Sequence, residues 1–171
     1  MGGEGSAEHD RWLRDALERH EGPLMRYACR LVGDLEQARD IVQETFLRLC
    51  RETQANLDGH LTPWLYRVCR SRALDFKRKE GRMRELAEDV ATPFVSHEPL
   101  PDYRAEARDD HAAVTRWLST LPTNQQEVVR LKFQGGLSYK EISEVTNLTV
   151  TNVGFLLHTA IKTLRGKMVE A

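Results

Sequence analysis

The chain has 171 residues, of which 40% are hydrophobic, 30% charged and 7% aromatic. This balance is typical of a soluble globular protein, and it excludes both wholesale disorder and a membrane protein. The sequence has no apolar run near the roughly 18 residues of a membrane span and no basic, apolar leader, so we expect a cytoplasmic protein without membrane insertion.

Motifs of catalysis and of metal binding are absent from the sequence. It has no HExxH motif, no P-loop and no dinucleotide-binding motif, and its six histidines are scattered without metal spacing. Cys29, Cys50 and Cys69 lie far apart without a CxxC pair, so we interpret them as small buried hydrophobic residues in a reducing compartment. We expect no cofactor, no metal and no enzymatic activity.

The net charge of −1 conceals a strong segregation along the chain. Residues 64–84 carry a net charge of +6, and residues 85–111 carry −6. The segments before and after them carry −4 and +3. Because salt screens charges beyond about 8–10 Å, a polyanion would sense the local field and not the average. A nucleic-acid partner is therefore compatible with the composition.

Helical periodicity recurs along the chain and strand signals are almost absent, which predicts an all-α protein. A first helix is predicted over residues 8–31, where Gly22 and Pro23 could bend or break it. Asp34 as N-cap, with a capping box to Gln37, predicts a second helix. The apolar stripe of the first helix comprises Trp12, Leu13, Ala16, Leu17, Leu24, Tyr27 and Leu31.

A third helix is predicted to start with Thr62 as its cap and Pro63 in its first turn, after a loop over residues 54–61. Residues 88–110 contain three prolines and many acids, which indicates an extended linker. We therefore expect two small helical domains, over residues 8–87 and 111–168, joined by an acidic linker.

Beyond the linker, capping signals recur. A helix is expected to break at Pro122, and Thr123 with Gln126 predicts a capping box for the next helix. Gly135 and Gly136 are expected to end that helix.

The most informative stretch follows these glycines. Ser138 and Glu141 have the spacing of a capping box, Asn147 suits a sharp turn with positive φ, and Thr149 is placed to cap a further helix. A short capped helix, a tight turn and a second capped helix form the helix-turn-helix pattern, whose second helix fits the DNA major groove. The alternative interpretation is an ordinary helical hairpin.

The basic segment 64–84 predicts contact with single-stranded DNA. Its cations can neutralise phosphates, and its interleaved aromatic rings can stack on unpaired bases. The alternative is a solvated helix face whose aromatic side chains belong to the core. The cations on this predicted helix include Arg67, Arg70, Lys77, Arg78, Lys79, Arg82 and Arg84, and the aromatic residues are Trp64, Tyr66 and Phe76.

Three stretches resemble bacterial sigma factors of the compact extracytoplasmic-function group. Asp40 to Leu49 (DIVQETFLRL) resembles region 2, and Pro63 to Asp75 (PWLYRVCRSRALD) resembles its promoter-melting helix. Leu121-Pro122 with residues 125–153 resembles region 4. The three matches stand in the order of the family and cover most of residues 10–168.

The resemblance implies an RNA polymerase sigma factor that directs promoter recognition, promoter melting and transcription initiation. It implies as partners core RNA polymerase, through the β′ clamp and the β flap, promoter DNA and an anti-sigma factor. Two alternatives are a stand-alone helix-turn-helix regulator and a sigma-like decoy. The implied polymerase-binding residues are Asp40, Gln43, Glu44, Leu47 and Arg48. The implied residues for binding and melting the −10 element are Trp64, Tyr66, Arg67, Arg70, Ser71, Arg72, Lys77 and Arg78.

The predicted recognition helix departs from the family pattern. Between Glu141 and Ile161 there is no Lys or Arg, whereas family members usually carry several there. Asn152 could read adenine, and Phe155 or a threonine methyl could meet a thymine methyl. The family also usually has Asn where this chain has Ser71. The expected −35 contacts are Tyr139, Lys140, Thr149, Thr151, Asn152, Phe155, His158, Thr159, Lys162 and Arg165.

Overall fold

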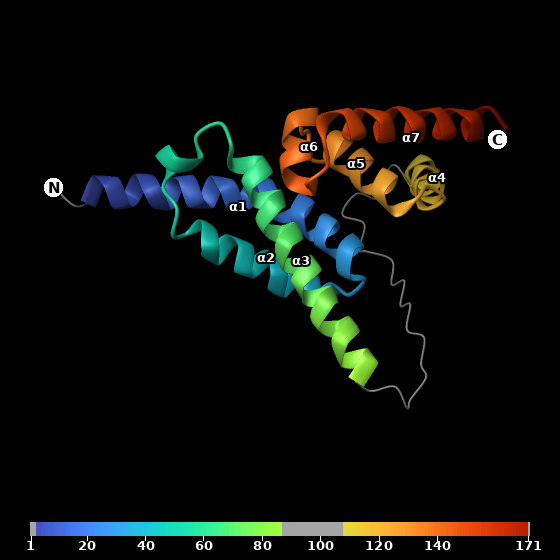
Figure 1. Ribbon diagram of the computed structural model, residues 1–171. Helices are drawn as coiled ribbons and strands as arrows, with labels where there is room; N and C mark the ends of the chain where they lie inside the picture. The colour runs from blue at the N-terminus through green and yellow to red at the C-terminus, as the bar shows by residue number, and fades with distance from the viewer. Residues whose placement is uncertain (1–2, 87–107, 171) are drawn as a thin grey trace. The chain divides into compact units, whose positions relative to one another are not determined.

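A computed structural model describes residues 3–86 and 108–170 (Figure 1). The described residues fold into α-helices and one short 3₁₀ helix, which confirms the all-α prediction. Helices α1 to α3 belong to one compact unit, and α4 to α7 belong to a second. Most of the expected linker, residues 88–107, lies outside the described residues. The remaining three linker positions, residues 108–110, belong to α4.

The first unit is a three-helix bundle. It consists of α1 (Gly3–Val32), α2 (Leu35–Leu49) and α3 (Leu61–Leu86), with the 3₁₀ helix η1 (Gln54–Leu57) between α2 and α3. Each of the three α-helices packs against the other two. The innermost side chains, all 0% exposed, include Leu24, Ala28, Ala38, Leu49, Leu65, Cys69 and Ala73.

Helix α1 runs through Gly22 and Pro23 without interruption. Proline removes one backbone hydrogen bond from a helix interior. Here the residues that follow, Leu24 and Ala28, are completely buried against the bundle, and this packing keeps the helix continuous. Leu17, which the apolar pattern placed in the core, is instead 40% exposed.

The starts of α2 and α3 differ in how well the sequence predicted them. The Asp34 carboxylate accepts a hydrogen bond from the Gln37 amide over 2.8 Å, which confirms the predicted N-cap. Helix α3 begins before Thr62, because the Trp64 amide already donates to the His60 carbonyl. The prediction of Thr62 as the cap is therefore wrong. Pro63 lies in the first turn, where a missing N–H has no cost.

The three cysteines are free, and two of them are buried. Burial raises the pKa of the Cys69 thiol to about 12 and also raises that of Cys29. Cys50 is exposed, so the expectation of a buried residue is wrong there. It is the C-cap of α2, where the chain leaves the bundle, and its amide donates to the Phe46 carbonyl.

The second unit consists of α4 (Arg108–Ser119), α5 (Thr123–Phe133), α6 (Tyr139–Thr146) and α7 (Val150–Glu170). Helix α7 packs against the three others. The buried side chains come mainly from α5, α6 and α7. They include Val128, Leu131, Leu137, Ile142, Val145, Val153, Leu157 and Ala160.

Helix α5 lacks the predicted capping box between Thr123 and Gln126. Its N-cap is Pro122, and no side chain caps the helix there. The Gln126 amide group instead donates to the Leu121 carbonyl over 2.8 Å, which holds the preceding turn. At the other end Gly136 has a φ of +67° and the Leu137 amide donates to Leu131, so the predicted glycine ending is confirmed.

Candidate nucleic-acid interface

Helices α6 and α7 form the predicted helix-turn-helix. The Ser138 amide donates to Glu141 over 2.7 Å and the Glu141 amide donates to the Ser138 hydroxyl over 3.2 Å, which completes the capping box. Asn147 adopts a left-handed conformation with φ 58° and ψ 23°. The backbone N–H of Asn152 donates to the Thr149 hydroxyl over 3.2 Å. All three local predictions are confirmed.

Two hydroxyl groups that the sequence reasoning did not single out hold the turn closed. The Ser143 hydroxyl donates to the Leu148 carbonyl over 2.5 Å. The Thr146 hydroxyl donates to the Ile142 carbonyl over 2.7 Å and accepts from the Leu148 amide over 3.4 Å. These bonds tie the end of α6 to the turn and thereby help to set the direction in which α7 leaves it.

Helix α7 has one buried and one exposed side at its N-terminal end. The buried side comprises Val153, Leu156, Leu157 and Ala160. The predicted contact residues occupy the other side, where Thr159 is half-buried and the others are exposed. The exposed positions on α7 and at its cap are Thr149, Thr151, Asn152, Phe155, His158, Lys162 and Arg165.

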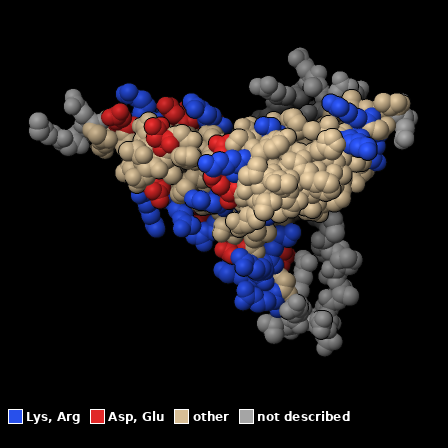
Figure 2. All heavy atoms as spheres, turned by 45° about the horizontal axis from the view of Figure 1, so that its top comes forward, with Lys and Arg blue, Asp and Glu red and all other residues tan. Residues whose placement is uncertain are grey.

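The surface over these positions is almost uncharged. Figure 2 shows a broad surface over the second unit that contains neither acidic nor basic side chains, with basic side chains at its edges. The exposed cations Lys140 on α6 and Lys162 and Arg165 on α7 are available for phosphates. This face can therefore read base edges mainly through neutral groups.

Tyr139 packs across the junction of α6 and α7. A Cβ atom added to Gly154 of α7 would lie 3.5 Å from the Cε2 atom of the Tyr139 ring. The Lys132 ammonium lies 5.5 Å from the centre of the Tyr139 ring and donates to the Leu137 carbonyl. Tyr139 keeps 43% of its surface exposed. It is thus positioned by the protein and still reaches the expected DNA side.

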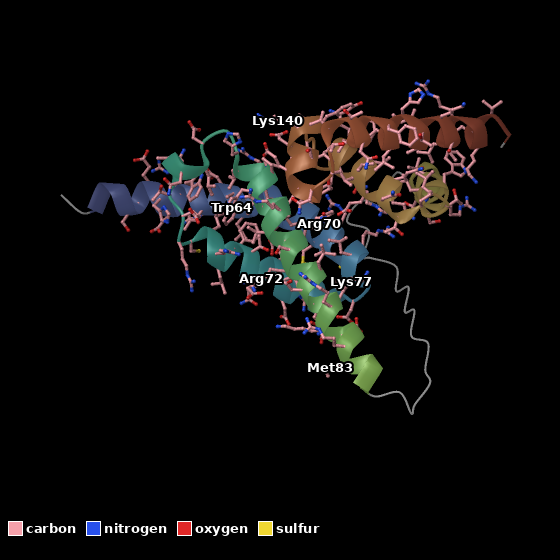
Figure 3. The ribbon with its side chains drawn as sticks, viewed as in Figure 1. Trp64, Arg70, Arg72, Lys77, Met83 and Lys140 are labelled. Atoms are coloured by element: carbon pink, nitrogen blue, oxygen red, sulfur yellow. The ribbon has the colours of Figure 1, made fainter. Side chains whose placement is uncertain are left out.

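The C-terminal part of α3 is basic and projects from the bundle (Figure 1). Its last fully buried residue among those described is Ala73, and Met83 is already 70% exposed. Figure 3 shows Arg70 and Arg72 on the middle part of α3 and Lys77 nearer the end marked by Met83. Basic side chains gather over this end in Figure 2.

Most of the predicted DNA contacts on α3 reach the solvent. Arg67, Ser71, Lys77 and Arg78 are exposed, whereas Trp64, Arg70 and Arg72 are partly buried. Lys79 and Arg82 are also exposed, and the Arg84 side chain lies outside the described residues. A row of cations with a half-buried indole at its start suits a single-stranded nucleic acid.

Tyr66 is a correction to the predicted site. It is 3% exposed and contacts Tyr27 edge-on, with ring centres 5.1 Å apart. Burial raises the pKa of its phenol to about 12. Tyr66 is therefore a core residue of the bundle and cannot stack on a base. Its position in the sequence, directly before Arg67 and four residues before Arg70, did not distinguish the two roles.

Two of the predicted DNA-contacting arginines form ion pairs within the protein. Arg78 pairs with Asp75, one turn earlier on α3. Arg72 pairs with Glu44 of α2, with 3.3 Å between Nη2 and Oε1. The second pair joins residues from separate helices, so no local pattern in the sequence could have revealed it.

The face of α2 that the sequence assigned to a protein partner is exposed. Asp40, Gln43, Glu44, Leu47 and Arg48 alternate with the buried positions Ile41, Val42, Thr45 and Leu49. Leu47 is 57% exposed among charged neighbours. An exposed leucine beside charged side chains is compatible with a protein-binding surface.

The loop over residues 54–61 and helix α1 together line an open hollow of about 290 Å³. Trp12, Arg19 and His20 of α1 line it together with Gln54 and Asp58 of the loop. The sequence reasoning named the loop but not the part of α1. Burial lowers the pKa of His20, and the nearby Arg19 charge lowers it further.

Two structural findings bear on other classes of function. Within residues 3–86 and 108–170, no three His, Cys, Asp or Glu side chains gather closely enough to share a metal ion. Over the same residues, no helix combines the length and the apolar character needed to cross a membrane.

The two units match two models of one family. Residues 16–83 match Sigma-70 region 2, and residues 111–164 match Sigma-70, region 4. Together the two matches span most of the chain and stand in the order that the sequence resemblance predicted.

Similar proteins of known class extend over nearly the whole chain. The extracytoplasmic-function (ECF) RNA polymerase sigma factor SigM of Bacillus subtilis is 27% identical over 90% of this chain and 93% of its own length. SigL of Mycobacterium tuberculosis belongs to the same class. It is 29% identical over 92% of this chain and 89% of its own length. A solved structure of the sigma factor RpoE with the anti-sigma factor NepR from Bartonella quintana shares the fold, with a TM-score of 0.67 and 20% identity over 93% and 95% of the two chains.

Proposed function

The chain belongs to the sigma-70 family, in its extracytoplasmic-function group, and we propose that it gives RNA polymerase its promoter specificity through the two surfaces described above. The observation that carries the proposal is that one chain has both a projecting basic helix end and a helix-turn-helix. The projecting basic end of α3 suits melted strands, whereas α6 and α7 suit closed duplex.

The first unit, residues 8–87, acts on the −10 element. Arg67, Lys77 and the neighbouring cations of α3 contact the backbone of the melted strand, and the loop over residues 54–61 lies beside the bases. Binding to unpaired strands lowers the free energy of the open state relative to the closed state. Promoter melting then follows from differential binding and needs no chemical step.

The second unit, residues 111–168, acts on the −35 element. Helix α7 enters the major groove with Thr151, Asn152, Phe155 and His158 toward the bases. The cations at the edges of this face bind phosphates. Residues 88–110 connect the two units.

The exposed face of α2 binds the β′ clamp of core polymerase, and the second unit binds the β flap. The mixture of an exposed leucine with charged side chains supports a protein partner at α2. An anti-sigma factor is a further proposed partner, since the structurally similar RpoE was solved with one. The protein has no catalytic role of its own, because phosphoryl transfer belongs to the polymerase, and it works in the cytoplasm.

The experiment that tests this function is a run-off transcription assay with purified core RNA polymerase and a promoter library. We expect product only when the chain is added, and sequencing of the transcribed templates gives the promoter. Duplex binding without core, together with no core-dependent transcript, would instead show a stand-alone regulator.

One observation favours a second candidate, a decoy that binds an anti-sigma factor without acting on promoters. It is the lack of cations on the recognition face between Glu141 and Ile161. Such a decoy would bind an anti-sigma factor and give no transcript from any library member. The basic end of α3 favours the sigma factor, because unbalanced charge of one sign costs self-repulsion unless a polyanion neutralises it.

A further inference from the structure

An exposed aromatic side chain lies on the uncharged face of α7. Phe155 is 65% exposed, although phenyl rings are among the side chains most often buried. Its neighbours Val153, Leu156 and Leu157 are in the core. The helix therefore cannot rotate to cover the ring without exposing these residues. The fold holds Phe155 on the side that faces DNA in a helix-turn-helix.

The charges of this face limit the bases that it can read. Bidentate contact from Arg or Lys is the commonest specific readout of guanine, and neither residue occurs between Glu141 and Ile161. The exposed Asn152 amide matches the donor and acceptor of adenine in the major groove. A phenyl ring offers only apolar surface, and the apolar group in the major groove is the C5 methyl of thymine. Both side chains thus favour A·T pairs.

The spacing of the two residues suits neighbouring base pairs. Asn152 and Phe155 are three residues apart, so they lie on the same side of α7 and about 4.5 Å apart along its axis. Successive base pairs are separated by about 3.4 Å. The amide and the ring can therefore meet two consecutive pairs.

Resting on the proposed function, we propose that Phe155 determines part of the promoter specificity by packing its ring on the methyl group of a thymine in the upstream element. The neighbouring A·T pair is read by Asn152. Lys140, Lys162 and Arg165 hold the flanking phosphates, and their contacts do not depend on the base sequence.

The test removes the methyl group and nothing else. The full chain is assembled with core polymerase on a promoter recovered from the run-off selection, and each upstream thymine is replaced singly by deoxyuridine. We expect about a fourfold loss of affinity at one position, because a buried methyl group contributes about 0.8 kcal/mol. With Phe155→Ala the two promoters should bind equally well. Phe155→Leu should keep part of the discrimination.

Phe133→Ala is the matched control. Phe133 is also 65% exposed and lies on α5 of the same unit, so the substitution removes the same side chain from a comparable environment. This variant should distinguish thymine from deoxyuridine as the wild type does. The proposal would be overturned if the wild type bound the thymine and deoxyuridine promoters equally well at every position. It would also be overturned if Phe155→Ala still distinguished thymine from deoxyuridine as the wild type does. If the wild type gave no core-dependent transcript at all, the proposed function would be contradicted instead. Failure of the thymine proposal and failure of the proposed function are therefore distinguishable.

Discussion

Arg72 of α3 is paired with Glu44 of α2, with 3.3 Å between the guanidinium Nη2 and the carboxylate Oε1. The pair joins a cation of the proposed DNA-binding helix to an acid of the proposed polymerase-binding face. Both side chains are partly exposed, at 38% and 51%, so the pair contributes at most about 1 kcal/mol to folding stability. Its larger effect is on the availability of Arg72 for a phosphate.

We predict that Glu44→Gln strengthens the binding of the free chain to single-stranded DNA. The substitution removes the carboxylate that competes with a phosphate for Arg72. One additional phosphate contact should steepen the slope of log affinity against log salt by about 0.7. Fluorescence anisotropy over a salt series measures this slope. In an Arg72→Gln background, Glu44→Gln should have little effect on the affinity for single-stranded DNA. An equal increase in affinity in that background would show that Glu44 acts by general repulsion of the DNA.

The exposed cations of α3 should matter more for promoter opening than for core binding. Arg67→Ala with Lys77→Ala removes two charges from the proposed strand-binding surface. A charge-assisted hydrogen bond contributes about 1.5 kcal/mol or more, so each lost contact should reduce open complexes about tenfold. Permanganate reactivity of unpaired thymines measures the open state.

The matched control for this pair is Arg11→Ala with Arg14→Ala. These exposed residues lie on α1 outside the region 2 match, and the net charge changes by the same amount. The control should leave permanganate reactivity at the wild-type level. Wild-type reactivity in the α3 variant would show that its cations do not hold the melted strand.

Gly154→Ala should stabilise the second unit. Gly154 lies within α7, where glycine is about 0.8–1 kcal/mol less favourable than alanine. The added Cβ would lie 3.5 Å from the Tyr139 ring, an ordinary van der Waals contact. The midpoint of urea unfolding should therefore rise. The comparison is Gly166→Ala, on the same helix, where the added Cβ would meet open space. If the unfolding midpoint rose for Gly166→Ala but fell for Gly154→Ala, the contact between the new Cβ and the Tyr139 ring would be strained.

Acid should destabilise the first unit in part through His20. Its pKa is lowered in the folded state, first by burial and then by Arg19, so the unfolded chain binds the proton more tightly. The stability that this group contributes is present above its unfolded pKa of 6.5 and is lost as the pH falls below that value. Between pH 7.5 and 5.5 the wild type should lose more unfolding free energy than His20→Gln. His60→Gln, at an exposed histidine, should behave as the wild type.

The sequence predicted the helix-turn-helix in detail because its signals are local. Ser138, Glu141, Asn147 and Thr149 each act within one turn of the chain, and each does what its residue type favours. The continuity of α1 through Pro23 was less predictable, because burial on both sides outweighs a local breaking signal.

The sequence failed where tertiary packing decides between two roles for one residue type. Tyr66 lies among arginines and resembles a base-stacking residue, yet its contact with Tyr27 of α1 makes it part of the core. The Glu44–Arg72 pair and the hollow between α1 and residues 54–61 depend on elements that meet only in the folded protein. At Thr123 a capping pattern is present, but Gln126 bonds to the Leu121 carbonyl instead.

The exposed thiol of Cys50, at the end of α2, is a site for selective labelling. Cys29 and Cys69 are buried and their raised pKa values keep both thiols protonated, which slows their reaction with maleimides. A fluorophore added to the native protein should therefore attach first at Cys50. That position ends the helix that carries Leu47 and Arg48, so the label would report the arrival of the polymerase without any engineered cysteine.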